Sequence, residues 1–128
     1  MKHTLLLAST GALVGLLSAF VGLPALVERI LWAIIYVLWV FYALRVNLEM
    51  PVRRLAFTST MAALLASSAQ VLFMEQYKAN NPWYADFFES NSVQELATDL
   101  LVRGIAFGVV CGVVVGLLVR WRQGSQAD

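Results

Sequence analysis

The side chains that could support covalent or metal chemistry are few, and they lie far apart in the chain. His3 is its one histidine and Cys111 its one cysteine. A zinc site needs several ligands that converge, and a nucleophile needs a neighbouring base to activate it. Neither residue has such a partner at a useful spacing, and Cys111 lies between valines, as a small core residue does. We therefore expect no catalytic residues, no cofactor and no metal site, and we predict that the protein is not an enzyme.

The acidic side chains offer one weaker possibility, a site for a hard cation such as calcium. The candidates are Asp86, Glu89, Glu95 and Asp99. They are not arranged as a ligand loop of fixed spacing, so a solvated acidic surface is the better interpretation. The net charge of +1 and the dispersed basic residues exclude a nucleic-acid-binding stripe.

The middle of each apolar run is free of charged residues, which argues against a proton relay or an ion-coupled transporter. Glu28, Glu75 and Arg103 are the deepest charges, all toward the same end of the predicted bundle. We expect structural ion pairs among Glu28, Asp99 and Arg103; attraction of anionic headgroups or a charged vestibule are the alternatives. Gln70 is the strongly polar residue of its run, and we favour a hydrogen-bonded structural contact over part of a polar path.

The elements that position these groups are membrane helices. A chain of 128 residues that is 60% hydrophobic and 13% charged cannot bury its apolar surface in one small water-soluble domain. We predict an all-α, polytopic membrane protein, a single integral domain built as a four-transmembrane-helix bundle. The predicted helices are at about 4–21, 24–46, 51–77 and 93–122, with an outer loop at about 78–92 and a polar tail at 123–128. The first run also resembles a signal peptide, and we expect it to be retained as a span.

The outer loop alternates aromatic rings with carboxylates, which is typical of a short element lying along the headgroup region. Its aromatic residues are Trp83, Tyr84, Phe87 and Phe88. Ser92 and Glu95 have the spacing of a capping box, so the last helix should begin near Val93.

Glycines at four-residue spacing mark two of the predicted helices. The last run carries Gly104, Gly108, Gly112 and Gly116, and the first carries Gly11, Gly15 and Ala19. Each glycine in a helix costs roughly 1 kcal/mol relative to alanine, so a glycine zipper of this kind needs a compensating backbone contact. We predict that the first and last helices cross closely, either within one subunit or between subunits.

Large rings recur at helical spacing in the second run, at Trp32, Tyr36 and Trp39. We favour a lipid-facing or interfacial surface for them over a ligand cage.

Basic residues gather on the side that holds both termini and the break near residues 47–50, and most acidic residues lie on the other side. The positive-inside rule therefore predicts cytoplasmic N- and C-termini and an outer acidic loop. A bacterial inner (plasma) membrane is the expected location.

Three functions are compatible with this sequence. The first is a structural or assembly subunit whose glycine and alanine faces pack against copies of itself, as a homo-oligomer, or against other membrane-protein subunits. The second is a homo-oligomeric channel or small transporter in which Gln70 and hydroxyl groups line a passage. The third is an intramembrane lipid-binding protein that holds lipid between the first and last helices, with membrane lipid as its partner.

Overall fold

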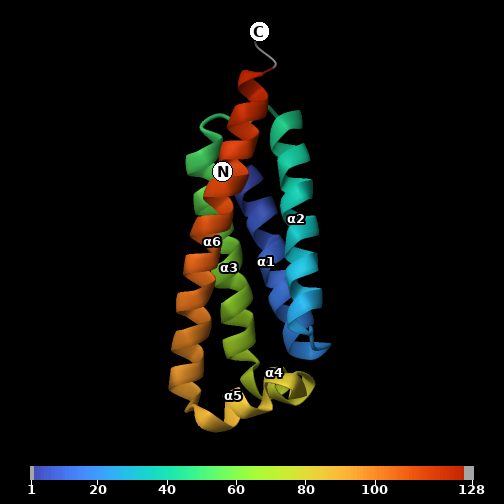
Figure 1. Cartoon of the computed structure of the whole chain (residues 1–128), viewed down its shortest axis with the longest axis vertical. Helices are drawn as coiled ribbons and strands as arrows, with labels where there is room; N and C mark the ends of the chain where they lie inside the picture. Colours follow the sequence, from blue (N-terminus) through green and yellow to red (C-terminus); the bar gives the residue numbers. More distant parts are fainter. Residues whose placement is uncertain (1, 126–128) are drawn as a thin grey trace.

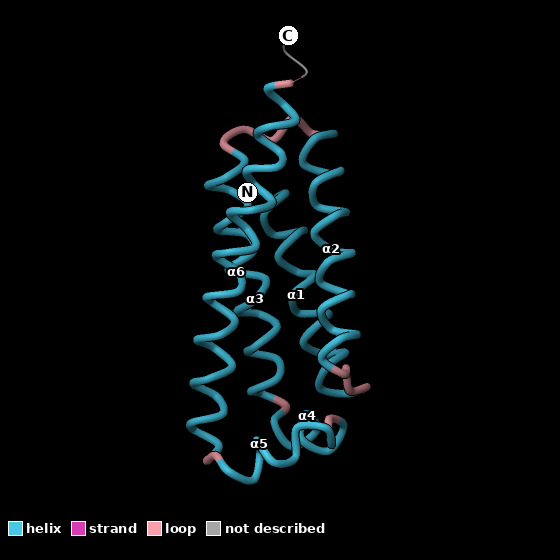
Figure 2. The backbone as a smooth tube through the Cα atoms, viewed as in Figure 1, coloured by secondary structure: helices cyan, strands magenta, loops and turns pink. Residues whose placement is uncertain are grey.

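The computed structural model describes residues 2–125, and this part of the chain is all-helical. Its elements are α1 (Lys2–Phe20), α2 (Ala25–Arg45), α3 (Pro51–Leu72), α4 (Met74–Asn80), the 3-10 turn η1 (Pro82–Tyr84), α5 (Ala85–Ser90) and α6 (Val93–Gly124). Helices α1, α2, α3 and α6 are each long and apolar enough to cross a membrane, so the predicted helical bundle is confirmed. They run side by side, and α4 and α5 lie across one end (Figure 1). Short turns join the helices (Figure 2). The last part of the predicted tail, residues 126–128, lies outside the described residues.

Helix α3 is the centre of the bundle, because the glycine faces of both α1 and α6 pack against its backbone. A Cβ atom added at Gly11 would overlap the carbonyl oxygen of Ala62. One added at Gly112 would lie 2.5 Å from the carbonyl oxygen of Leu55, and one at Gly108 would lie 2.7 Å from the Cα of Thr60. Such separations are too short for real side chains. The glycines therefore allow direct contact between helix backbones.

The prediction that the first and last helices cross closely is wrong, because each glycine face contacts α3 and not the other glycine face. The reason is that α3 carries small residues on two neighbouring stripes, among them Ser59 and Ala63 on one side and Ala62 and Ala66 on the other. Helix α3 can thus pack against a glycine-bearing helix face on each side. Ala19 is fully buried too, in a second cluster with residues of α4 and the start of α6.

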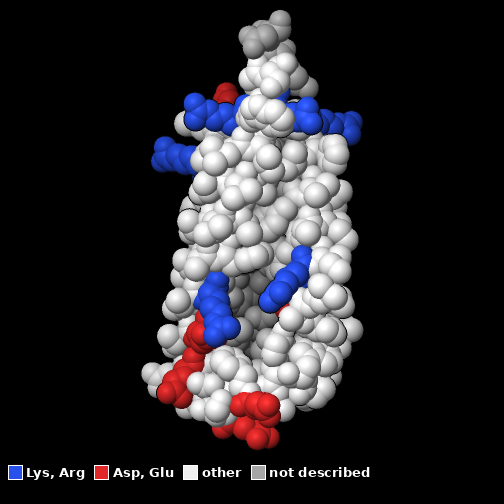
Figure 3. Space-filling view, in the orientation of Figure 1, with Lys and Arg blue, Asp and Glu red and all other residues white. Residues whose placement is uncertain are grey.

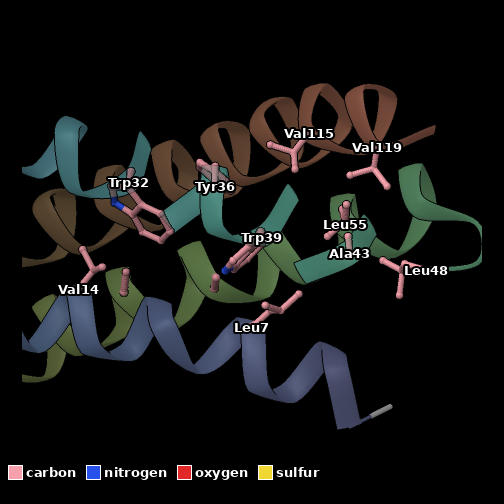
Figure 4. Close-up of a cluster of buried hydrophobic side chains, with 12 residues drawn as sticks. Leu7, Val14, Trp32, Tyr36, Trp39, Ala43, Leu48, Leu55, Val115 and Val119 are labelled. Carbon is pink, nitrogen blue, oxygen red and sulfur yellow. The ribbon is translucent and has the colours of Figure 1, made fainter. Parts of the chain in front are cut away.

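The prediction that the rings of α2 face lipid is also wrong. Trp32, Tyr36 and Trp39 are 6%, 8% and 2% exposed and point into the bundle (Figure 4). The small residues of α3 leave a wide groove beside it, and only large side chains on α2 can fill that groove. The Tyr36 hydroxyl forms a 2.6 Å hydrogen bond with Ser59 Oγ, and the Trp32 ring meets the Phe107 ring of α6 edge-on. Helix α2 is therefore attached through long side chains, whereas α1, α3 and α6 are in backbone contact.

The third predicted span ends earlier than expected: α3 stops at Leu72, the backbone bends at Phe73, and α4 runs across the end of the bundle. Asn81 gives the physical reason. Its side-chain amide is fully buried and donates to the carbonyl oxygen of Ser18 at 2.8 Å, while its Oδ1 accepts from the backbone N–H of Leu23 at 3.1 Å. The turned segment thus satisfies a carbonyl at the end of α1 that would otherwise lack a partner.

Helix α6 begins at the predicted capping box, which is confirmed. The Ser92 hydroxyl accepts from the Glu95 backbone N–H at 3.3 Å, and the Glu95 carboxylate accepts from the Ser92 backbone N–H at 2.8 Å.

We predict that Gly112→Ala destabilises the bundle, because its new methyl group would force the α3 and α6 backbones apart. The expected loss of unfolding free energy is about 1–3 kcal/mol, as for other overpacked sites. Thermal unfolding in detergent, followed by circular dichroism, measures it. The matched control is Gly124→Ala at the exposed end of the same helix, where an added Cβ meets no atom within 4 Å. Equal stability of the two variants would contradict backbone contact at Gly112.

Candidate ligand-binding cavity

A cavity of about 310 Å³ lies between α2, α3 and α6, near the end of the bundle that carries α4 and α5. Its position corresponds to the hollow in the lower half of the space-filling view, which basic side chains flank on both sides (Figure 3). The hollow lies on the lateral face of the bundle, so it opens sideways and not through either end.

The cavity exists because the walls contributed by α3 and α6 carry very small side chains. Ala63, Ala66 and Ser67 of α3 and Gly104 of α6 line it, and a Cβ atom added at Gly104 would overlap Ser67 Oγ. The Ser67 hydroxyl donates to the carbonyl oxygen of Leu100 at 2.9 Å, which fixes the two helices together at the base of the cavity. Helix α2 stands away from this wall.

The aromatic wall of the cavity comes from Trp32 and Phe107. Trp32 stacks on Tyr36, with ring centroids 5.7 Å apart, and the Phe107 ring contacts both of them, edge-on to Trp32 at 5.6 Å and tilted to Tyr36 at 6.2 Å. These rings close the cavity toward the middle of the bundle. The side toward the α4 and α5 end carries Tyr84.

Polar groups from three helices line this otherwise apolar space. They are Glu28 and Arg29 of α2, Ser67 and Gln70 of α3, and Arg103 of α6. Gln70 is 5% exposed, and its amide donates to Ser18 Oγ of α1 at 3.1 Å. The hydrogen-bonded role expected for Gln70 is thus the geometry that is observed, at the edge of the cavity.

Of the charged residues Glu28, Asp99 and Arg103, only Asp99 and Arg103 form an ion pair. Arg103 Nε bonds to Asp99 Oδ1 at 2.8 Å, one turn away on α6, and its guanidinium lies 5.7 Å from the centre of the Phe87 ring. Glu28 was expected to pair as well, but among residues 2–125 no basic group lies within 4.0 Å of its carboxylate. The reason is that Arg103 is engaged by Asp99, and Arg29 follows Glu28 directly, so the two side chains leave α2 in different directions.

Tyr84 connects the outer loop to these charges. Burial raises the pKa of its phenol, the negative charge of Glu28 raises the pKa further, and the positive charge of Arg29 lowers it in part. The phenol therefore stays protonated at neutral pH and can donate as well as accept a hydrogen bond at the rim of the cavity.

The other aromatic residues of the outer loop close the end of the bundle. Phe88 packs edge-on against Tyr77, with centroids 5.6 Å apart, and Phe87 lies under the Arg103 guanidinium. Trp83 is 47% exposed and is the most exposed of the four aromatic rings of this loop.

Sequence reasoning identified Glu28, Gln70, Tyr84, Gly104 and Arg103 as separate features, and the cavity brings them together. It did not single out Arg29 or Phe107, and it did not place Trp32 in a site. The sequence contained one indication that Trp32 lies beside Glu28: the two residues are four positions apart and therefore share a helix face.

No protein-family model, curated protein or solved structure matches this chain.

We predict that Glu28→Gln lowers the pKa of Tyr84, because it removes a negative charge that favours the neutral phenol. Arg29→Gln should raise the same pKa, since it removes the opposing positive charge. NMR of ¹³C-labelled tyrosine in micelles, followed against pH, measures both shifts. If neither substitution moves the Tyr84 titration, the two side chains do not share one site with this phenol.

Proposed function

We propose that the protein binds one phospholipid of the surrounding membrane in this lateral cavity, with the lipid phosphate held by Arg29 and Arg103. The observation that carries the proposal is the presence of two guanidinium groups at a cavity that opens sideways from a membrane-embedded bundle. Charged residues inside a membrane span are costly and generally mark a functional site. Guanidinium groups are well suited to phosphate, because they present several N–H donors in a fixed planar arrangement.

The depth of Arg103 fits the proposal. The apolar part of α6 extends from about Leu100, so Arg103 lies roughly one helical turn inside it. A guanidinium at this depth reaches the headgroup level. The cavity volume is at the low end of the range of about 300–1,000 Å³ for ligand pockets, which suits a headgroup and the adjoining glycerol. The acyl chains would remain in the bilayer, against the exposed apolar faces of α2 and α6.

The assembly-subunit hypothesis has less support, because the glycine faces on which it was based are covered by α3 of the same chain. The channel hypothesis has less support for a related reason. Hydroxyl groups assigned to its lining hydrogen bond within the bundle: Ser59 with Tyr36, and Ser67 with the backbone of α6.

We also propose the orientation in which both termini face the cytoplasm of a bacterial inner membrane. Basic residues gather at the upper end of the bundle and acidic residues at the lower end (Figure 3). The basic residues of the termini and of the break between α2 and α3 are Lys2, Arg45, Arg53, Arg54, Arg120 and Arg122. By the positive-inside rule, the lipid-binding cavity then lies in the outer leaflet.

Cysteine labelling checks this orientation. In a Cys111→Ser background, Glu89→Cys in α5 should react with a membrane-impermeant maleimide added to intact cells, whereas Gln123→Cys near the end of α6 should react only after permeabilisation. The reverse pattern would place the cavity in the inner leaflet.

We predict that Arg29→Gln and Arg103→Gln each weaken phospholipid binding. A hydrogen bond to a charged group contributes on the order of 1.5 kcal/mol, which corresponds to about a tenfold change in affinity. Quenching of tryptophan fluorescence by lipids with brominated chains measures binding, and Trp32→Phe identifies the part of the signal that comes from the cavity.

The matched control is Arg53→Gln, an exposed arginine at the opposite end of the bundle that should leave binding unchanged. Brominated diacylglycerol, which lacks the phosphate, should quench Trp32 weakly. Equal binding of diacylglycerol and phospholipid, or unchanged binding in both cavity variants, would refute the proposed role of the arginines.

A further inference from the structure

The Glu28 carboxylate is a second feature of the cavity that binding of a phosphate alone does not explain. Glu28 is half-buried at the cavity and lies close to the Trp32 indole and the Gln70 amide. Among the described residues it has no basic partner within 4.0 Å. A carboxylate at this depth without a counter-charge is unfavourable, and a nearby lipid phosphate would make it more so.

An occupant that carries charges of both signs would complement the charged groups around the cavity. Arg103 is paired with Asp99 through Nε, and among residues 2–125 its Nη atoms have no hydrogen-bond acceptor, so they can still donate to a phosphate. The groups of the cavity without a partner of opposite charge are the Arg29 guanidinium and the Glu28 carboxylate. An anionic headgroup would compensate Arg29 and leave Glu28 unpaired. A headgroup that carries a phosphate and an ammonium group a few bonds apart would compensate both.

We propose that the cavity selects a phospholipid whose headgroup bears a primary amine, with the ammonium bound by Glu28 and the phosphate by the arginines. This inference rests on the proposed lipid-binding function. A primary ammonium carries three N–H donors, and the Glu28 carboxylate and the Tyr84 hydroxyl are acceptors at the same rim.

A quaternary ammonium fits this site less well. It has no N–H donor for the carboxylate, and it is generally recognised by the open faces of an aromatic cage. The Trp32 ring does not offer such a cage, because it is stacked on Tyr36 and is in edge contact with Phe107. Selection should therefore favour phosphatidylethanolamine over both phosphatidylcholine and phosphatidylglycerol.

The experiment compares three brominated lipids with the same acyl chains, namely phosphatidylethanolamine, phosphatidylglycerol and phosphatidylcholine, by quenching of Trp32 in the full-length protein. The wild type should prefer phosphatidylethanolamine by about tenfold. Glu28→Gln should remove most of this preference by weakening the binding of phosphatidylethanolamine, with phosphatidylglycerol bound as well as before or better. Glu28→Asp, which retains the charge, should keep a preference for phosphatidylethanolamine.

Glu75→Gln, an exposed carboxylate of α4 outside the cavity lining, is the matched control and should behave as the wild type. Equal or tighter binding of phosphatidylglycerol by the wild type would overturn the inference and leave the proposed phospholipid site intact. An unchanged preference for phosphatidylethanolamine in a folded Glu28→Gln variant would also overturn the inference and leave the proposed phospholipid site intact. If no phospholipid binds better than diacylglycerol, the proposed function and this inference fail together. The wild-type comparison decides the inference even if Glu28→Gln does not fold.

Discussion

The backbone contact of α3 with α1 on one side and α6 on the other is the constraint on which the rest of the structure depends. In lipid there is little hydrophobic force to hold helices together, so packing and hydrogen bonds must do so. Because Gly11 and Gly112 have no side chains, the helix axes approach until the backbones are in contact. The three helices α1, α3 and α6 therefore form one closely packed layer. Helix α2 must cover this layer with side chains of its own, which explains why its rings point inward.

Close approach also explains where the polar groups of α3 are found. Ser59, Ser67 and Gln70 are buried, and each reaches a partner on a different helix: α2, α6 and α1 respectively. A hydroxyl or amide in hydrocarbon without a partner would be costly, so these bonds favour the observed helix arrangement over others with the same glycine contacts. The small residues set how near the helices come, and the polar residues help to set which faces meet.

The helices themselves could be predicted from the sequence, because span length, the Ser92 capping box and the glycine spacing are local properties. The partner of each glycine face could not. A stripe of small residues shows that a helix is flat on one side, but α1, α3 and α6 all have such stripes, and the sequence does not say which two meet. The burial of Trp39 follows only after that pairing is known, because the groove it fills is created by the pairing. The cavity is harder still to predict, since it is a volume left over between helices and no single residue encodes it.

The two kinds of contact in this bundle have a further consequence for how a lipid could enter. The α3–α6 wall of the cavity is backbone against backbone, so widening it would disrupt the centre of the bundle. The opposite wall, α2, is connected to α3 by side chains such as Tyr36, and a shift of these rings leaves the glycine contacts unchanged. Opening along the α2–α6 boundary, where Arg29 and Arg103 lie, would therefore leave the glycine contacts in place but would separate the Phe107 ring from Trp32 and Tyr36. A headgroup that entered from the plane of the membrane, as the proposed function requires, would meet the two guanidinium groups of this boundary, with Glu28 and Gln70 lining the same space. The cavity is thus bounded on one side by the backbone contact of α3 with α6 and on the other by α2, which is held through side chains, with Arg29 and Arg103 where α2 and α6 meet.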